Sequence, residues 1–126
     1  MPYELSWEDR GVVFRFWGVA SDDDLRQSNL EIYDDPRFES LEHEIADFTE
    51  VTRLDFSSDA VRTVARWDSE ASKRNPTIRV AIIGEDSLLI GLANMYRIVF
   101  DVQDGNWEQE QFAGMDEARS WLARST

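Results

Sequence analysis

The chain has 126 residues, of which 26 are acidic and 13 are basic, and its formal net charge is −13. Nucleic acids and anionic membranes are bound by clustered Lys and Arg side chains, so this charge excludes both as general partners. The length fits a single domain over residues 1–126, and a hydrophobic fraction of 42% is sufficient for a core.

Cysteine is absent, which excludes disulfides, thiolate metal ligands and a cysteine nucleophile. The N-terminal sequence MPYELSWEDR has neither the basic start nor the apolar run of a signal peptide. No apolar stretch approaches the ~20 residues that a membrane-spanning helix needs. We therefore expect a cytoplasmic protein without integral membrane association.

An antiparallel hairpin is expected at the N-terminus. Its strands are Tyr3–Trp7 and Gly11–Trp17, and Gly11 supplies a residue that tolerates positive φ in the turn. The second strand alternates, so one of its faces is strongly apolar and carries Val12, Phe14 and Phe16.

A helix is expected next. Ser21 and the three aspartates after it favour a capped helix start over a cation site, because no acidic loop of calcium-binding spacing follows. The helix ends at Asp34-Asp35, since residues before Pro36 are pushed out of the α region. Phe38 and Leu41 then anchor the connection to the core.

The remainder of the chain alternates strands and helices. A short strand at His43–Phe48 leads through an irregular segment into the stretch LDFSSDAVRT, where a helix begins. The pattern then predicts a helix over 60–75, a buried strand over 78–84, a helix over 88–100 capped by Asp86 or Ser87, an edge strand over 107–112 and a helix over 115–123. This order predicts an α/β fold in which a mixed, mostly parallel sheet of about five strands packs against four helices.

Catalytic signatures are missing from the chain. It contains no GxGxxG, GxxxxGK[ST] or GxSxG motif. The single histidine, His43, has no cysteine partner, and a catalytic pair with Ser57 or Ser58 would lack a group to orient the imidazole. We therefore expect no enzymatic activity, no metal site and no cofactor.

The element order resembles that of the STAS domain, which is named for sulfate transporters and anti-sigma-factor antagonists. More closely, the whole chain resembles a bacterial family of small stand-alone STAS-like proteins, related to those antagonists and to CRAL-TRIO lipid-transfer domains. Six segments carry the resemblance: Met1-Pro2-Tyr3-Glu4 with Trp7, Phe16-Trp17-Gly18-Val19, Asp35-Pro36-Arg37-Phe38, Asp47-Phe48-Thr49-Glu50-Val51, residues 75–81 and residues 116–122.

The resemblance implies a regulatory site at the start of the second helix. The antagonists' switch reads Asp-Leu-Ser-x-Val-x-x-x-Asp-Ser-Ser-Gly, and residues 47–58 align with it without a gap. Asp55 matches the motif aspartate and Ser57 the phosphorylated serine, while Phe56 replaces the first serine and Ser58 the glycine. The alternative is that Ser57 or Ser58 only caps the helix.

Two functions follow as hypotheses. The first is a regulatory module that binds an unknown protein partner, with a partner-binding or phospho-switch site at Asp55, Ser57, Ser58 and Arg62. The second is a small apolar-ligand or lipid binder, in which the helix Leu88–Phe100, weakened by Gly91, lifts from the sheet. Its ligand would contact Leu92, Met95, Tyr96, Val99 and Phe100. A symmetric homodimer is a further expectation.

Overall fold

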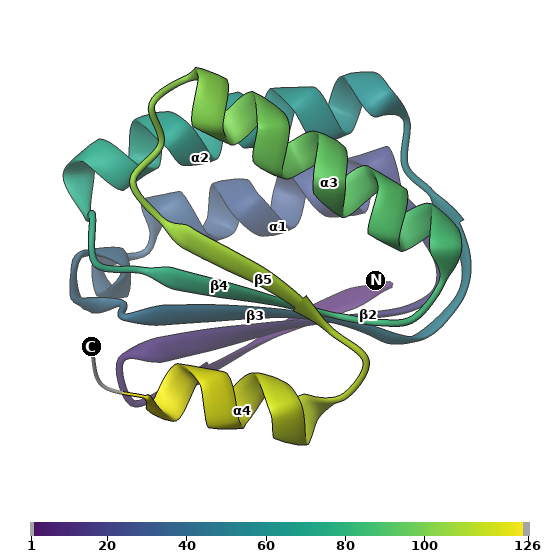
Figure 1. The fold of residues 1–126 in the computed structure, drawn as a ribbon, viewed down its shortest axis with the longest axis horizontal. Helices are drawn as coiled ribbons and strands as arrows, with labels where there is room; N and C mark the ends of the chain where they lie inside the picture. Colours follow the sequence, from purple (N-terminus) through teal and green to yellow (C-terminus); the bar gives the residue numbers. More distant parts are fainter. Residues whose placement is uncertain (1, 125–126) are drawn as a thin grey trace.

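A computed structural model describes residues 2–124 as a three-layer α/β fold (Figure 1). Met1, which opens the first segment of the resemblance, lies outside the described residues, as do Ser125 and Thr126. The elements run in the order β1 (Tyr3–Glu8), β2 (Gly11–Ser21), α1 (Asp22–Asp34), a 3-10 helix (Pro36–Ser40), β3 (His43–Asp55), α2 (Ser58–Arg74), β4 (Arg79–Ile83), α3 (Ser87–Val102), β5 (Glu108–Phe112) and α4 (Met115–Ala123).

The five strands form one sheet in the order β1-β2-β3-β4-β5. β1 and β2 pair antiparallel as a hairpin, and the other three pairings are parallel. The predicted mixed, mostly parallel sheet is therefore confirmed, as are the N-terminal hairpin and the position of β5 at the edge. No helix within residues 2–124 is both long enough and apolar enough to cross a membrane.

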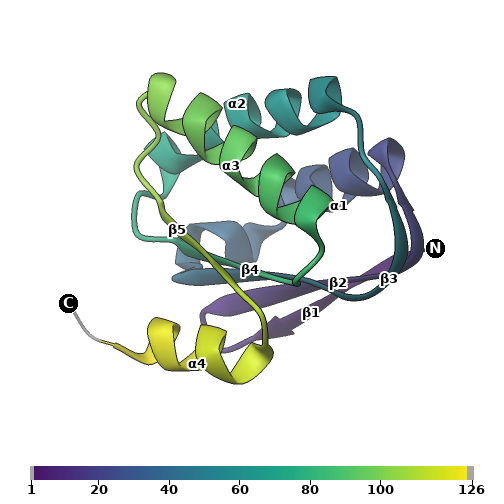
Figure 2. The same ribbon diagram turned by 45° about the vertical axis from the view of Figure 1, so that its right-hand side comes forward.

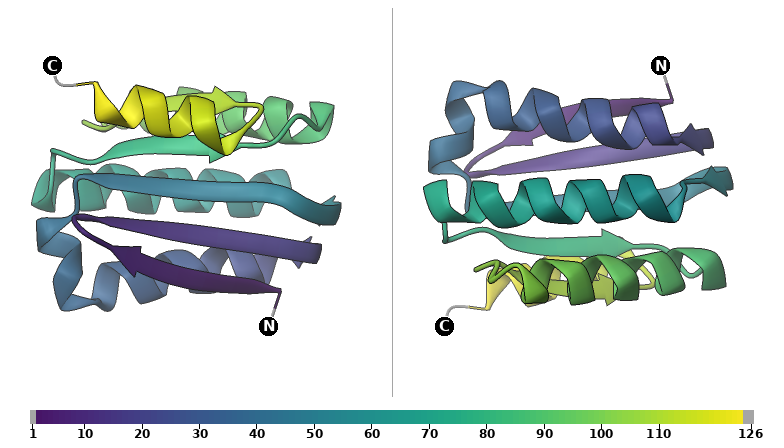
Figure 3. Two further views of the ribbon diagram at one scale, coloured as in Figure 1. Left: turned by 90° about the horizontal axis from the view of Figure 1, so that it is seen from below. Right: turned by 90° about the horizontal axis from the view of Figure 1, so that it is seen from above.

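The helices form unequal layers on the two faces of the sheet. α1, α2 and α3 lie side by side on one face, and α4 lies on the other face (Figures 2 and 3). α4 contacts β3, β4 and β5, so it covers only part of its face. The larger core lies under the three helices, because the alternating strands direct Phe14, Phe16 and Val80 to that side.

β2 and β3 are longer than their sequence pattern predicted. They continue past Trp17 and Phe48 and pair with each other as far as Ser21 opposite Asp55. The expected irregular segment between Phe48 and the second helix was therefore wrong. Its side chains are mostly exposed, so it carries no apolar alternation, and the strand is held by backbone hydrogen bonds to β2.

The turn of the hairpin also differs from its prediction. The residue with positive φ is Arg10, at 56°, rather than Gly11. Gly11 is required for another reason, since a Cβ built there would lie 2.0 Å from the His43 imidazole. The connection after α1 does anchor the core as expected, with Phe38 and Leu41 buried.

Candidate functional site

The turn between β3 and α2 resolves which serine caps the second helix. Ser57 has extended backbone geometry, and its Oγ accepts a hydrogen bond from the Ala60 backbone N–H at 3.1 Å. Ser58 is already the first residue of α2. Ser57 is thus the N-cap, and it satisfies one of the free N–H groups at the helix start.

Ser57 is also bound to the first turn of α1. Its backbone N–H donates to Asp22 Oδ1 at 2.6 Å, and its hydroxyl donates to Asp22 Oδ2 at 2.7 Å. The neighbouring Ser21 caps α1, and its side chain and that of Asp24 form a capping box. Asp22 therefore joins the N-terminal ends of α1 and α2 through one serine.

The surface around Ser57 is acidic. A hollow of ≈380 Å³ lies there and is lined by Ser21, Asp22, Asp23, Asp55, Phe56 and Ser57. The nearby guanidinium groups are already paired, Arg53 at 3.7 Å from Asp55 of the hollow and Arg62 at 2.5 Å from Asp59 of α2. The structure thus brings Asp55 and Ser57 together in the hollow, whereas Ser58 and Arg62 of α2 are not among its lining residues.

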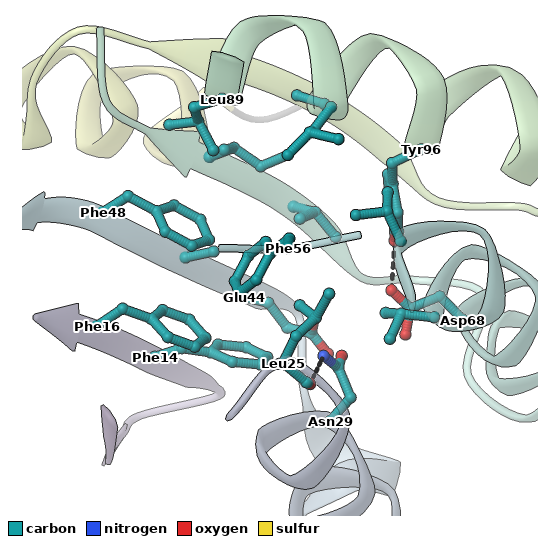
Figure 4. Close-up of a pocket in the computed structure, with 17 residues that line it drawn as sticks. Phe14, Phe16, Leu25, Asn29, Glu44, Phe48, Phe56, Asp68, Leu89 and Tyr96 are labelled. Carbon is teal, nitrogen blue, oxygen red and sulfur yellow. Dashed lines mark hydrogen bonds between the residues drawn. The ribbon is translucent and has the colours of Figure 1, made fainter. Parts of the chain in front are cut away.

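A second site is a partly open cavity of ≈90 Å³ between the sheet and the helices α1, α2 and α3 (Figure 4). One side is aromatic, with Phe14, Phe16 and Phe48 on the left of Figure 4. Asp68 and Tyr96 lie on the opposite side. The cavity is therefore apolar over most of its wall and polar at one end.

Two buried carboxyl groups form the polar end. Asp68 of α2 is 4% exposed and accepts hydrogen bonds from the hydroxyls of Tyr33 and Tyr96. Burial raises the pKa of Asp68 to about 6 despite these two donors. Glu44 of β3 is 3% exposed, and burial, together with the nearby Asp68 charge, raises its pKa well above the ordinary range.

The predicted apolar-ligand residues fall into two groups. Leu92 and Tyr96 line the cavity. Met95 contacts the Arg62 guanidinium, Val99 packs against the core, and Phe100 is fully buried against Trp107, so these three lie away from the cavity.

Glu44 and Asp68 were missed as candidate site residues, although the sequence carries a signal for both. Glu44 alternates with Ala46 and Phe48 on the apolar face of β3. Asp68 falls four residues after Val64 on the apolar stripe of α2. An acid in the middle of an apolar stripe is a buried-polar signal, and buried acids require a partner or a proton.

A surface groove adjoins the cavity. It has a volume of ≈240 Å³ and lies between the end of β3, over residues 48–54, and the loop Gly84–Asp86 before α3. Asp86, rather than Ser87, caps α3 by accepting from the backbone N–H groups of Leu88 and Leu89. Phe48 and Leu89 line both the groove and the cavity, so the two hollows adjoin at these side chains.

His43 belongs to a third cluster, at the other end of β3 from Ser57. Its Nε2 lies 2.7 Å from Glu8 Oε1, and Arg119 of α4 binds both Glu8 oxygens. Arg119 is the main cause that lowers the pKa of Glu8 to about 2. The cluster ties the hairpin to β3 and α4, and it places His43 far from Ser57 and Ser58, so the serine–histidine pair considered above does not form.

Within residues 2–124, no group of three or more His, Asp or Glu side chains is arranged to hold a metal ion.

The fold is shared with solved structures of low sequence identity. The phosphorylated form of the Bacillus cell fate determinant SpoIIAA is 13% identical, with a TM-score of 0.60 over 95% of this chain and 98% of that chain. The unphosphorylated anti-sigma factor antagonist SpoIIAA is 17% identical, with a TM-score of 0.60 over 98% and 99%. An uncharacterized DUF3478-family protein from Shewanella loihica PV-4 is 20% identical, with a TM-score of 0.55 over 96% and 92%.

These likenesses show that the chain has a STAS-like, SpoIIAA-like fold. No protein-family model matches the sequence, and no curated protein matches it.

Proposed function

We propose that this protein is a non-enzymatic regulatory module of the cytoplasm that binds a partner protein through the turn Asp55–Ser58 and the first turn of α2. The observation that carries the proposal is the double role of Ser57, which caps α2 and binds Asp22 of α1. One exposed hydroxyl therefore holds two helix ends together at a surface that a partner can reach. The SpoIIAA-like fold and the ungapped alignment of residues 47–58 support the same site.

Phosphorylation of Ser57 would act as a switch through charge. A phosphoryl group would replace the hydroxyl proton donated to Asp22 and add about −2 charges beside Asp22 and Asp55. The helix N-terminus favours such an anion, whereas the carboxylates repel it. The expected result is that the starts of α1 and α2 separate, which changes the surface presented to the partner.

The test is incubation with anti-sigma-factor-type serine kinases of the source organism, followed by mass spectrometry of the peptide that contains Ser57 and Ser58. We expect phosphate on the wild type and none on Ser57→Ala, with Ser58→Ala as the matched control that is still modified. Binding of the same kinases to each variant is measured by calorimetry. Absence of phosphate on the wild type would contradict the phospho-switch. Absence of both phosphate and kinase binding would also contradict the proposed interaction surface.

A second candidate is the binding of a small apolar ligand or lipid, because the cavity lies beneath α3 and Leu92 and Tyr96 line it. Native mass spectrometry of freshly purified protein tests this candidate. A non-covalent adduct of lipid-like mass is expected, and its loss when the helix is stiffened by Gly91→Ala would indicate entry past α3. Bare protein in every preparation would contradict it.

The same spectra test the predicted symmetric homodimer. The large apolar side chains that α3 exposes at its two ends, Leu88, Ile98 and Val102, are the surface on which such a dimer would form. A monomer at all concentrations would exclude it.

A further inference from the structure

The Glu44 carboxyl has an unusual environment. It projects from β3 into the cavity, is 97% removed from solvent, and receives no hydrogen bond from the residues that the structure describes. Asp68 differs, because the Tyr33 and Tyr96 hydroxyls both donate to it. A buried carboxyl without a donor is costly unless it stays protonated or meets a cation.

The described residues that line the cavity supply no such cation. They include two acids, Glu44 and Asp68, and no lysine, arginine or histidine. The rest of the wall is aromatic and aliphatic, and Asn29 contributes an amide whose N–H₂ group donates to the Leu25 carbonyl at 2.8 Å. The polar end therefore lacks a positive partner, while the apolar end offers ring faces that favour hydrocarbon and cations alike.

We propose that the cavity binds a small amphiphilic amine, whose ammonium group pairs with Glu44 and whose hydrocarbon part lies against Phe14, Phe16 and Phe48. This inference rests on the second candidate function above and names its ligand class. It is independent of the surface at Ser57.

The charges around the cavity favour an amine over other amphiphiles. A fatty acid would add a third carboxyl to a space that already holds two. An alcohol would form a hydrogen bond with Glu44 but no ion pair. The volume of ≈90 Å³ is several times the ~10–15 Å³ that one water needs, which suits a ligand of a few heavy atoms rather than a long lipid chain.

Proton release should accompany binding. The titratable groups that face Glu44 are Tyr33 on α1, Asp68 on α2 and Tyr96 on α3, and the residues opposite it on β2 and β4 are Val12 and Val80. None of them is cationic, and burial together with the Asp68 charge favours the protonated form of Glu44. When an ammonium ion enters, Glu44 becomes a carboxylate and its proton passes to solvent.

Entry is expected past Phe48 and Leu89, where the cavity and the groove adjoin. Leu89 lies in the first turn of α3, directly after the loop Gly84–Asp86. A rotation of these two side chains opens the path without unfolding an element.

The test is calorimetry of the full chain with benzylamine and butylamine, compared with benzyl alcohol and 1-butanol. We expect the amines to bind ~10–100-fold more tightly than the alcohols, the difference that a charge-assisted hydrogen bond supplies. In two buffers of different ionisation enthalpy at pH 7, the apparent heats of amine binding should differ, because the Glu44 proton passes to the buffer.

Two variants locate the effect. Glu44→Gln keeps the shape of the side chain and should reduce amine affinity to that of the alcohols, whereas Glu110→Gln, at an exposed acid of β5, should change nothing. The comparison of amines with alcohols on the wild type stands even if Glu44→Gln folds poorly. Equal affinities for amines and alcohols would overturn the amine inference and leave a ligand cavity, and binding of neither would overturn both.

Discussion

α2 and α3 lie side by side over the same sheet and are almost equally long, yet they are packed differently (Figure 3). α2 buries eight residues, three of which are polar. α3 has the more apolar sequence and buries only three, Leu89, Tyr96 and Phe100. The apolar content of a helix therefore does not measure how deeply the helix is packed.

The outer faces of the two helices also differ in the kind of side chain that they expose. α2 exposes charged side chains with ion pairs such as Lys73–Glu70, whereas α3 exposes Leu88, Ile98 and Val102. The cavity lies below the N-terminal half of α3, between its two buried ends. α3 is therefore fixed to the core at Leu89, Tyr96 and Phe100, and the cavity lies beneath the segment between the first two.

Phe100→Ala should have the largest effect, because this ring is fully buried and stacks on Tyr96 and Trp107. We expect a loss of ~3–5 kcal/mol in the free energy of unfolding, measured by urea denaturation. Ile98→Ala, on the exposed face of the same helix, should stay within ~0.5 kcal/mol. Similar losses for both would show that α3 is packed on all sides.

The buried acids should make stability depend on pH. Asp68 has a pKa of about 6 in the fold, and a buried acid with a raised pKa stabilises the protein fully below its unfolded pKa. From the unfolded value of ~4 to pH 6, stability should fall by an amount on the order of 3 kcal/mol. The pKa of Glu8 is lowered to about 2, so Glu8 has the opposite effect. Its contribution to stability is lost as pH falls below ~4.

Glu44→Gln isolates the contribution of the second buried acid of the cavity, while the Asp68 side chain stays in place. The free energy of unfolding of the variant, measured by urea denaturation, should increase relative to that of the wild type as pH rises from 5 to 8. Parallel curves for the two proteins would mean that Glu44 does not hold its proton in the fold.

Ser57→Ala should cost ~1 kcal/mol, because α2 loses its N-cap and Asp22 loses its hydroxyl donor. Ser58→Ala, one residue inside the helix, is the matched control and should change the unfolding free energy by less than ~0.5 kcal/mol. A larger loss of unfolding free energy for Ser58→Ala than for Ser57→Ala would assign the cap to Ser58.

Gly91→Ala should have the smallest effect and the opposite sign. Gly91 lies inside α3, and a Cβ built there meets no atom within 4 Å. Alanine should therefore stabilise the helix by ~0.5–1 kcal/mol, seen as a higher thermal midpoint. A loss of stability would show that α3 needs the glycine for a contact with its surroundings.

The hairpin, the order of the elements, the four helices and the acidic surface could be predicted from the residues alone, because periodicity, caps and turns act between residues close in the chain. The remaining features depend on contacts between distant segments. Polar residues after Phe48 became strand because β2 lies beside them, and Ser57 rather than Ser58 became the cap because Asp22 approaches it from α1. Glu44 and Asp68 met in one cavity only when β3 and α2 packed together, since contacts between distant segments leave no local pattern.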